Sequence, residues 1–251
     1  MPYRPKTEPS IRRVPGRGLR NQIESPILGD YEQAIEVLAS TEVPVVGIAG
    51  FLGAGKSTIA RALEAKFAYV RIDVDALGHK ALASCAAQIR ELFGPKVMTG
   101  EGEVDRKVLG SIVFSDSKER LKLEAVVHPW MRTELWRQIG ILSETGKGLK
   151  KKGVIVDAAL LFPMKLSVFC DLVLWVRAPL SVRLKRVVLR DKVSREAALV
   201  RLRGQAQLAP SKDASDYADI LIVENREVRR TMRFLSEIWE QGTWTKKGSS
   251  S

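Results

Sequence analysis

The sequence predicts a three-layer α/β/α fold built on a five-stranded parallel sheet. Short β-branched runs alternate along the chain with longer amphipathic segments, as is typical of parallel α/β proteins. Residues 50–57 read GFLGAGKS, directly after the first of these runs, and match the pattern G-x-x-x-x-G-K-[ST] at every position. A chain of 251 residues with 45% apolar content can bury a full core without disulfides. These observations together predict an α/β fold of the P-loop NTPase type.

The predicted strands are the short apolar, β-branched runs. They span Val43–Ala49, Tyr69–Val74, Val154–Val156, Leu172–Val176 and Ile220–Val223. Each run has the length and the residue types of a buried strand. Helices are expected on both sides of the first strand, over Asp30–Ala39 and Ser57–Lys66.

A long segment between the second and third strands, Ala76–Leu142, has mostly helical periodicity. An insertion at this place usually carries the site for a second substrate, so we expect a helical acceptor-binding insertion over about residues 76–142. Residues 1–25 are basic and rich in proline, which predicts a flexible extension, with a targeting or docking segment as the other interpretation. One domain is expected over residues 26–245, followed by a disordered tail over 246–251.

The motif at residues 50–57 predicts a phosphate-binding loop. Its three glycines let the backbone turn tightly and point several N–H groups inward, and the next helix adds its positive N-terminus. Lys56 can then reach the β- and γ-phosphates, and Ser57 is placed to ligate Mg²⁺. The chain is therefore expected to bind a nucleoside triphosphate.

Acidic residues follow two of the predicted strands. Asp73 and Asp75 end the second strand, and Asp157 ends the third. In a parallel sheet these positions lie beside the phosphate loop. Asp157 is expected in the Mg²⁺ shell, through water, or alternatively as a helix N-cap. Asp75 is expected to act as a general base near the γ-phosphate, or alternatively only to cap the helix that begins at Ala76.

The net charge of +12 raises the alternative of nucleic-acid binding. Much of the excess lies in the N-terminal extension, at Lys147–Lys152 and between Arg177 and Arg203, and this distribution argues against it. The longest apolar runs are far shorter than the roughly 20 residues of a membrane helix, and no signal peptide opens the chain. A cytoplasmic protein is expected, with Cys85 and Cys170 as reduced core residues.

Beyond the P-loop, a set of short motifs occurs in a fixed order. They are Asp73-Val74-Asp75 with His79, Phe93-Gly94, Gly102, Arg106-Lys107, Leu109, Val113-Phe114, His128-Pro129, Asp157–Pro163, Arg186–Asp191, Arg195-Glu196 and Arg201–Gln205. Together with Gly50–Thr58 they resemble the dephospho-coenzyme A kinases, which phosphorylate the ribose 3′-hydroxyl of dephospho-coenzyme A with ATP. The resemblance covers about Val45 to Asn225 and includes the family's D-x-D-x-x-x-[HR] and D-x-P-L-L-F-E segments.

The resemblance implies a role for each matching residue. It makes Asp75, Lys56 and Arg186 the catalytic residues, with Arg186 stabilising the transferring phosphoryl group from a helical lid over about residues 180–210. The implied ATP-binding residues are Gly50, Leu52, Gly53, Ala54, Gly55, Lys56, Ser57, Thr58, Arg190 and Asn225. The implied acceptor-binding residues are Asp75, His79, His128, Leu160 and Leu161, and Ser57 and Asp157 are the implied metal ligands. The lid arginines could instead form a solvated basic helix face, and His128 could instead be a capping or core histidine.

Some positions depart from the family pattern. Ala159 stands where the family has proline and Pro163 where it has glutamate, one extra residue precedes Asn225, and Arg226 follows where small residues are usual. The leading hypothesis is a dephospho-coenzyme A kinase that uses ATP and Mg²⁺. The alternatives are a related P-loop kinase for another small molecule or a nucleoside monophosphate, and a nucleotide-binding module that has lost catalysis. The sequence leaves the oligomeric state open.

Overall fold

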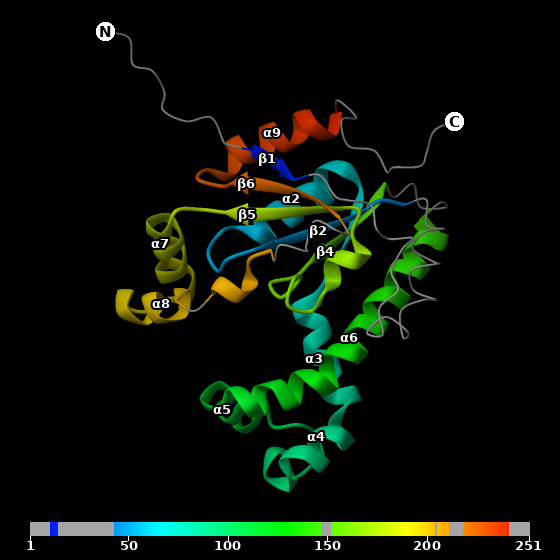
Figure 1. Ribbon diagram of the computed structural model, residues 1–251, viewed down its shortest axis with the longest axis vertical. Coiled ribbons are helices and arrows are strands. Elements are labelled where there is room, and N and C mark those ends of the chain that lie inside the picture. The colour runs from blue at the N-terminus through cyan, green and yellow to red at the C-terminus, as the bar shows by residue number, and fades with distance from the viewer. Residues whose placement is uncertain (1–10, 15–42, 147–151, 204, 211–217, 241–251) are drawn as a thin grey trace. The chain divides into compact units, whose positions relative to one another are not determined.

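The computed structural model describes residues 11–14, 43–146, 152–203, 205–210 and 218–240 (Figure 1). The chain divides into two compact units, one of Met1–Ile72 with Gly140–Ser251 and one of Asp73–Ile139. The helix predicted at Asp30–Ala39 and the tail predicted at 246–251 lie outside the described residues.

A six-stranded sheet forms the centre of the first unit, in the order β1-β6-β5-β2-β4-β3. Its strands are β1 (Ile11–Val14), β2 (Val45–Gly50), β3 (Tyr69–Asp73), β4 (Gly153–Asp157), β5 (Leu172–Arg177) and β6 (Asp219–Glu224). Strand β2 pairs in parallel with both β4 and β5, and β5 pairs in parallel with β6. The five predicted strands β2 to β6 and their parallel arrangement are thus confirmed.

Strand β1 was not predicted. It pairs antiparallel with β6, with Ile11 opposite Val223 and Val14 opposite Ile220. The prediction of a flexible extension over residues 1–25 is therefore wrong for Ile11–Val14, and the rest of that segment lies outside the described residues. The physical reason is that β6 would otherwise present unpaired backbone groups at the sheet edge, which a short β-branched segment can pair with.

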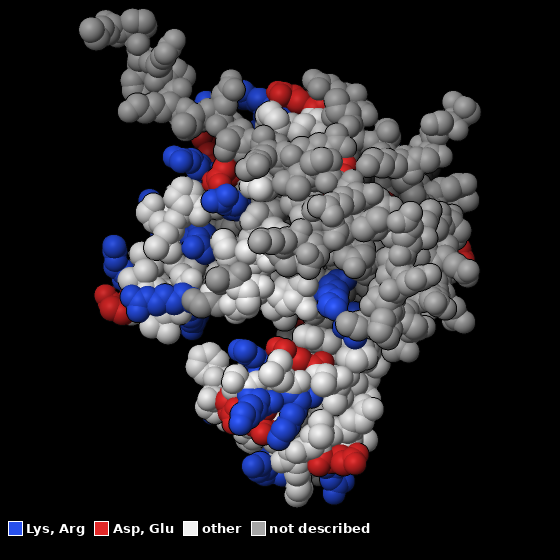
Figure 2. Space-filling model, in the orientation of Figure 1, with Lys and Arg blue, Asp and Glu red and all other residues white. Residues whose placement is uncertain are grey.

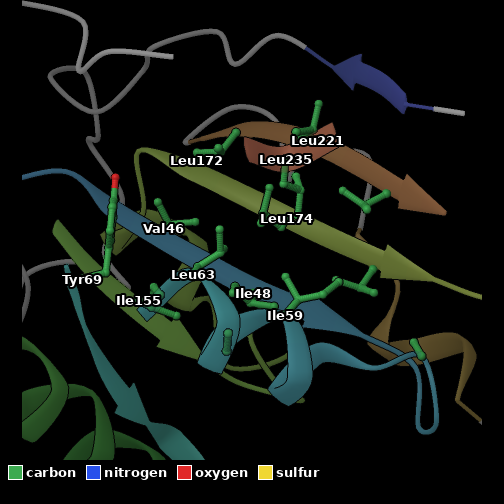
Figure 3. Close-up of a cluster of buried hydrophobic side chains, with 14 residues drawn as sticks. Val46, Ile48, Ile59, Leu63, Tyr69, Ile155, Leu172, Leu174, Leu221 and Leu235 are labelled. Atoms are coloured by element: carbon green, nitrogen blue, oxygen red, sulfur yellow. The ribbon is translucent and has the colours of Figure 1, made fainter. Parts of the chain in front are cut away.

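One face of the sheet is buried under two helices, α2 (Lys56–Phe67) and α9 (Val228–Glu240), which contact each other. Alternate side chains of β2 and β5, including Val46, Ile48 and Leu174, pack there with Ile59 of α2 and Leu235 of α9 (Figure 3). The alternation follows from the two-residue period of a strand. On the other face of β2, a Cβ built on Gly47 would lie 2.7 Å from Leu161 Cδ1, so the segment after β4 covers that face.

Two helices after β5 form a small cluster of their own. They are α7 (Leu180–Asp191) and α8 (Arg195–Leu202), and their buried residues are Leu184, Val187, Ala198 and Leu202. The Ser194 side chain caps α8 by accepting a hydrogen bond from Ala197 N at 3.1 Å. The 3₁₀ turns η4 (Leu166–Phe169) and η5 (Ala206–Leu208) complete the unit in the described chain.

The second unit is helical in its described residues. It contains α3 (Val74–Ser84), α4 (Ala86–Phe93), the 3₁₀ turn η3 (Pro95–Val97), α5 (Arg106–Ser115) and most of α6 (Ser117–Gly146), which carries Pro129 inside it. Aspartates begin two of these helices: Asp73 Oδ1 accepts from Ala76 N, and Asp105 Oδ1 from Lys107 N and Val108 N. The helical periodicity of residues 76–142 therefore predicted the right structure. Across the described residues, no helix has the length and apolar character needed to span a membrane.

Candidate active site

The P-loop lies where the chain leaves β2 and enters α2. Strand β2 has β4 on one side and β5 on the other, so the loop emerges at the point where the strand order changes direction. Ligands of open parallel sheets bind at such a point, outside the carboxyl ends of the strands. Gly50 is required there, because a Cβ at this position would collide with the carbonyl oxygen of Val176 on β5.

The loop backbone has the conformation that an anion site needs. Gly53 and Gly55 have φ angles of +76° and +96°, which glycine adopts without strain. Ala54 N donates to Phe51 O at 3.1 Å, which closes the turn. Gly55 is the N-cap of α2 and has no side chain to occupy the first N–H groups of that helix. These donors and the helix dipole can therefore serve a phosphate.

Arg186 of α7 hydrogen-bonds the backbone of the P-loop and of the segment after β6. Its Nη1 donates to Gly53 O at 3.2 Å and Ala54 O at 3.0 Å, and its Nη2 donates to Asn225 O at 3.2 Å and Arg226 O at 3.1 Å. Burial lowers the pKa of this guanidinium below its usual value. With four backbone acceptors around it, Arg186 fixes the loop to the segment after β6. Its predicted contact with the transferring phosphoryl group stays a prediction.

Asn225 supports the same loop carbonyl from inside the protein. It follows β6 directly, is 0% exposed, and its Nδ2 donates to Ala54 O at 2.7 Å. The hydroxyl of Thr231, on α9, lies 3.1 Å from Asn225 Oδ1 and 3.0 Å from Glu227 O. The extra residue before Asn225 does not prevent this contact. The Asn225 side chain is thus engaged with the loop backbone, and its predicted contact with ATP stays a prediction.

A third contact joins the loop to the segment after α8. Gln205 Oε1 accepts from Leu52 N at 3.1 Å and from Arg183 Nη1 at 3.3 Å. The Arg183 guanidinium lies over the Phe51 ring, 4.9 Å from its centroid, and that ring packs edge-on against Trp175 at 5.1 Å. Burial lowers the pKa of Arg183 as well. The predicted lid segment therefore contacts the loop in this structure.

The side chains predicted to meet the triphosphate begin α2. Lys56 is its first residue, and its Nζ lies 3.5 Å from Phe51 O, folded back over the loop. Ser57 and Thr58 follow in the first turn and are exposed. A lysine amine, a serine hydroxyl and helix N–H groups at one place are the groups that bind phosphate oxygens and Mg²⁺ in P-loop proteins.

Asp157 ends β4, next to β2, as predicted. It is only 6% exposed, and its Oδ2 lies 3.2 Å from Arg71 Nη1 of β3. The nearby Glu64 carboxylate lies 3.7 Å from Arg71 Nε. A buried carboxylate needs such a partner, because desolvation of an unpaired charge is costly. This ion pair fixes the Asp157 side chain, and its contribution to a Mg²⁺ shell stays a prediction.

Arg190, at the end of α7, forms an ion pair within the predicted lid. Its Nε and Nη2 donate to the two carboxylate oxygens of Asp191 at 2.6 and 3.2 Å, and Arg201 Nη1 donates to Asp191 Oδ2 at 3.0 Å. The hydrogen bond to Asp191 raises the pKa of Arg190, and the hydrogen bond from Arg190 lowers the pKa of Asp191. The charge of Arg190 is shared with this carboxylate in the structure.

The remaining predicted acceptor residues of the helical insertion belong to the second unit. Asp75 and His79 are exposed on the first two turns of α3, and Asp75 is in its first turn. His128 is half-buried on α6, and burial is the main reason why its pKa lies below the ordinary value. Glu124 opposes this shift and Arg132 adds to it. His128 is therefore expected to be neutral at pH 7.

A model of the dephospho-CoA kinase family matches residues 44–229, which is more than half of the chain. The chain belongs to the dephospho-CoA kinase family. The matched range runs from the start of β2 to the start of α9 and includes the whole loop with Arg186, Gln205 and Asn225.

Individual relatives agree with this family. A dephospho-CoA kinase from Carboxydothermus hydrogenoformans is 29% identical over 82% of this chain and 98% of its own length. One from Syntrophus aciditrophicus is 32% identical over 78% of this chain and 82% of its own. Among solved structures, TT1252 from Thermus thermophilus has a TM-score of 0.62 and 32% identity, covering 81% of this chain and all of its own. A dephospho-CoA kinase from Campylobacter jejuni has a TM-score of 0.52 and 25% identity, covering 80% and 97%.

The two departures after β4 lie in a turn. Ala159 is half-buried and Pro163 exposed. Met164 N donates to Leu160 O and Lys165 N donates to Phe162 O, both at 2.9 Å, so these bonds do not use the N–H group that proline lacks. Within this turn Leu160 is exposed, whereas Leu161 is 0% exposed and packs on Gly47. The Leu161 side chain is part of the core here, and its predicted contact with the acceptor stays a prediction.

Several side chains at the loop were not predicted from the sequence. The family resemblance places Arg186 and Gln205 in a lid, and nothing in the motif indicates that both bond the loop backbone. Arg71 and Thr231 had no assigned role. The sequence signal for Thr231 was weak, because a threonine in a helix can bond the carbonyl four residues earlier, as Thr231 does with Glu227 O, without a partner outside the helix.

Proposed function

We propose that this protein is a dephospho-CoA kinase that transfers the γ-phosphoryl group of ATP to the 3′-hydroxyl of dephospho-coenzyme A. The observation that carries the proposal is the family match over residues 44–229, which contains a loop with the backbone conformation of a phosphate site. The products are ADP and coenzyme A. The bond between the γ-phosphorus and the β,γ-bridging oxygen breaks, and a bond to the 3′-oxygen forms.

The loop and the start of α2 bind the triphosphate in this proposal. The N–H groups around Gly53 and Gly55 hold phosphate oxygens, and Lys56 exchanges its weak contact with Phe51 O for the β- and γ-phosphates. Leu52, Ala54 and Thr58 complete the ATP site through the loop and the first turn. Charge on the equatorial oxygens grows during transfer, and fixed donors stabilise it without having to reorganise.

Mg²⁺ is proposed to bind with ATP. In the described part of the chain, no group of three His, Cys, Asp or Glu side chains could hold a metal ion by itself. This fits Mg²⁺, which usually binds through substrate phosphates, several waters and one or two protein ligands. The exposed Ser57 is the proposed direct ligand, and Asp157, fixed by Arg71, the proposed ligand through water. The ion would neutralise phosphate charge during transfer.

The acceptor side of the proposal rests on the second unit and on the turn after β4. Asp75 is the proposed general base, which accepts the proton of the 3′-hydroxyl as the oxygen attacks. Its exposure at the start of α3 suits this role, because a base must reach the substrate. His79, His128 and Leu160 are the proposed acceptor contacts, and a neutral His128 can donate one hydrogen bond and accept another.

The cell compartment is proposed from the chemistry. ATP and dephospho-coenzyme A are metabolites of the cell interior, and Cys85 and Cys170 are both buried thiols. These thiols are compatible with a reducing compartment. We propose the cytoplasm as the site of action.

Nucleic-acid binding is not favoured. On the face shown in Figure 2, the Lys and Arg side chains of the second unit lie among Asp and Glu side chains. Ion pairs such as Arg190–Asp191 and Arg201–Asp191 also neutralise part of the charge on α7 and α8. Polynucleotide affinity depends on clustered cations that are not neutralised by nearby carboxylates, and on these surfaces the two kinds of charge are mixed.

An acceptor panel tests the proposal. ADP release from Mg-ATP should be stimulated by dephospho-coenzyme A and not by adenosine, AMP or the other nucleoside monophosphates. Stimulation by a nucleoside monophosphate instead would assign the protein to a different acceptor. ATP binding without stimulation by any acceptor would favour a module that has lost catalysis.

A further inference from the structure

The P-loop carbonyl of Ala54 points into the protein. Residue 54 is 0% exposed, so this oxygen has no access to water and needs donors from the protein. It accepts from Asn225 Nδ2 at 2.7 Å and from Arg186 Nη1 at 3.0 Å. When the carbonyls of a loop point away from the ligand, its N–H groups can converge on a phosphate. The donors to Ala54 O therefore hold the loop in its phosphate-binding form.

The shorter of these two bonds depends on which way the Asn225 amide faces. Nδ2 can donate to Ala54 O only if Oδ1 faces the other side, where the Thr231 hydroxyl lies 3.1 Å away. Among the described residues, the Thr231 hydroxyl is the hydrogen-bond donor to Oδ1. In the reversed orientation, two oxygens would face each other at Ala54. A hydrogen bond from the Thr231 hydroxyl to Oδ1 therefore stabilises the amide orientation in which Nδ2 donates to Ala54 O.

The Thr231 hydroxyl has two acceptors and a single proton. Besides Asn225 Oδ1, it lies 3.0 Å from the carbonyl oxygen of Glu227, the residue immediately before α9. A threonine in a helix commonly bonds that carbonyl, so donation to Asn225 competes with a local bond. Thr231 is 1% exposed and Asn225 is 0% exposed, so solvent water cannot replace the hydrogen bond between them.

We infer that Thr231 is a positioning residue for triphosphate binding, which acts through Asn225 on the carbonyl of Ala54. The inference rests on the proposed function only in that the chain binds ATP at this loop. It gives α9, which otherwise covers the sheet, a part in forming the nucleotide site through Asn225. It also explains why Asn225 is buried behind the loop.

The test compares variants on a single helix. Thr231→Val keeps the shape but removes the proton, leaving Asn225 Oδ1 buried without this donor. The Kd for ATP and for ADP should then rise about 5- to 50-fold, because a buried unsatisfied group at a ligand site has a cost of that order. Thr231→Ser restores the hydroxyl and should return the affinity to within about twofold. Thr231→Ala leaves space for a water molecule that can donate to Oδ1, so its Kd should lie between those of Thr231→Ser and Thr231→Val.

Ser236→Ala is the matched control. Ser236 also lies on α9 and is buried, with 6% exposed, and its Oγ donates to Met232 O within the helix at 2.7 Å. Its loss should lower the melting temperature without changing the Kd for ATP. A second control is AMP, which lacks the β-phosphate that the loop binds, so its affinity should be the same in the wild type and in Thr231→Val.

Three results would overturn the inference. They are an unchanged Kd for ATP in Thr231→Val, an equal loss of affinity in Ser236→Ala, or an equal loss of affinity for AMP, which would place Asn225 at the base or sugar instead. All of these binding measurements use a nucleotide without an acceptor. A wild-type protein that binds ATP but does not phosphorylate dephospho-coenzyme A would therefore count against the proposed acceptor alone.

Discussion

Arg186 has a different environment from that expected of a lid arginine. Its guanidinium donates to the backbone carbonyls of Gly53, Ala54, Asn225 and Arg226, and it is partly buried. A planar fork with five donors suits several carbonyl acceptors in a way that a single ammonium group cannot. Arg186 therefore supports the loop backbone in this structure.

Replacement of Arg186 separates these two roles. In Arg186→Lys we expect the Kd for ADP to rise about 10- to 100-fold, because several charge-assisted bonds to the loop are lost before any chemistry occurs. Titration calorimetry with ADP would measure it, with Lys185→Ala, an exposed neighbour on α7, as the control. A normal Kd with a reduced kcat would instead assign Arg186 to the transition state alone.

Asp75 is the residue on which proton transfer depends in the proposal. Asp75→Asn should lower kcat by about 100-fold or more, within the usual range for loss of a general base, and leave the Kd for ATP within about twofold. Asp73→Asn is the comparison, because asparagine can replace aspartate as the α3 N-cap that accepts from Ala76 N. Wild-type turnover in Asp75→Asn would remove Asp75 as the base.

Protonation of His128 is expected to make the stability of the protein depend on pH. Its pKa is lowered in the fold, mainly by burial, so below its ordinary pKa of 6.5 the unfolded chain takes up a proton more readily than the folded one. The stability contributed by neutral His128 is thus complete above 6.5 and is lost as the pH falls towards the folded pKa. The melting temperature should decrease more between pH 7.5 and 5.5 in the wild type than in His128→Gln. Parallel pH profiles would contradict this.

The described strands and helices differ in how well the sequence alone predicted their presence and their ends. Strands β2 to β6 were predicted within two residues at each end, because β-branched apolar runs both favour and bury strands. Strand β1 was missed because its four residues form a strand only by pairing with β6, a long-range contact that composition does not show.

A glycine pair in the second unit tests local backbone preference. Gly110 lies inside α5 and Gly102 has a φ of +82°, and a Cβ at either would meet no atom within 4 Å. Because space is not limiting, backbone preference decides: Gly110→Ala should stabilise by about 1 kcal/mol, and Gly102→Ala should destabilise by about 1–2 kcal/mol. Thermal unfolding would show opposite shifts of a few degrees. Equal shifts would mean that tertiary contacts dominate at both sites.

For the molecule as a whole, the site combines parts that the sequence reveals with parts that only folding assembles. The loop, Lys56 and Ser57 were evident because their motif is contiguous. The supports were not, because Asn225 lies 171 residues after Ala54 and reaches it only through the pairing of β6 with β5. The loop is thus formed at one place in the chain and stabilised by α7, the segment after α8, and the β6–α9 connection.

The most direct test of this account is the transfer of labelled γ-phosphate from ATP to dephospho-coenzyme A by the full chain with Mg²⁺. We expect the label in coenzyme A, on the ribose 3′-oxygen, in equal amount with ADP. Lys56→Ala, which loses a group that the triphosphate needs, should abolish the transfer. Release of the label only as inorganic phosphate, or its transfer to another position or acceptor, would contradict the account.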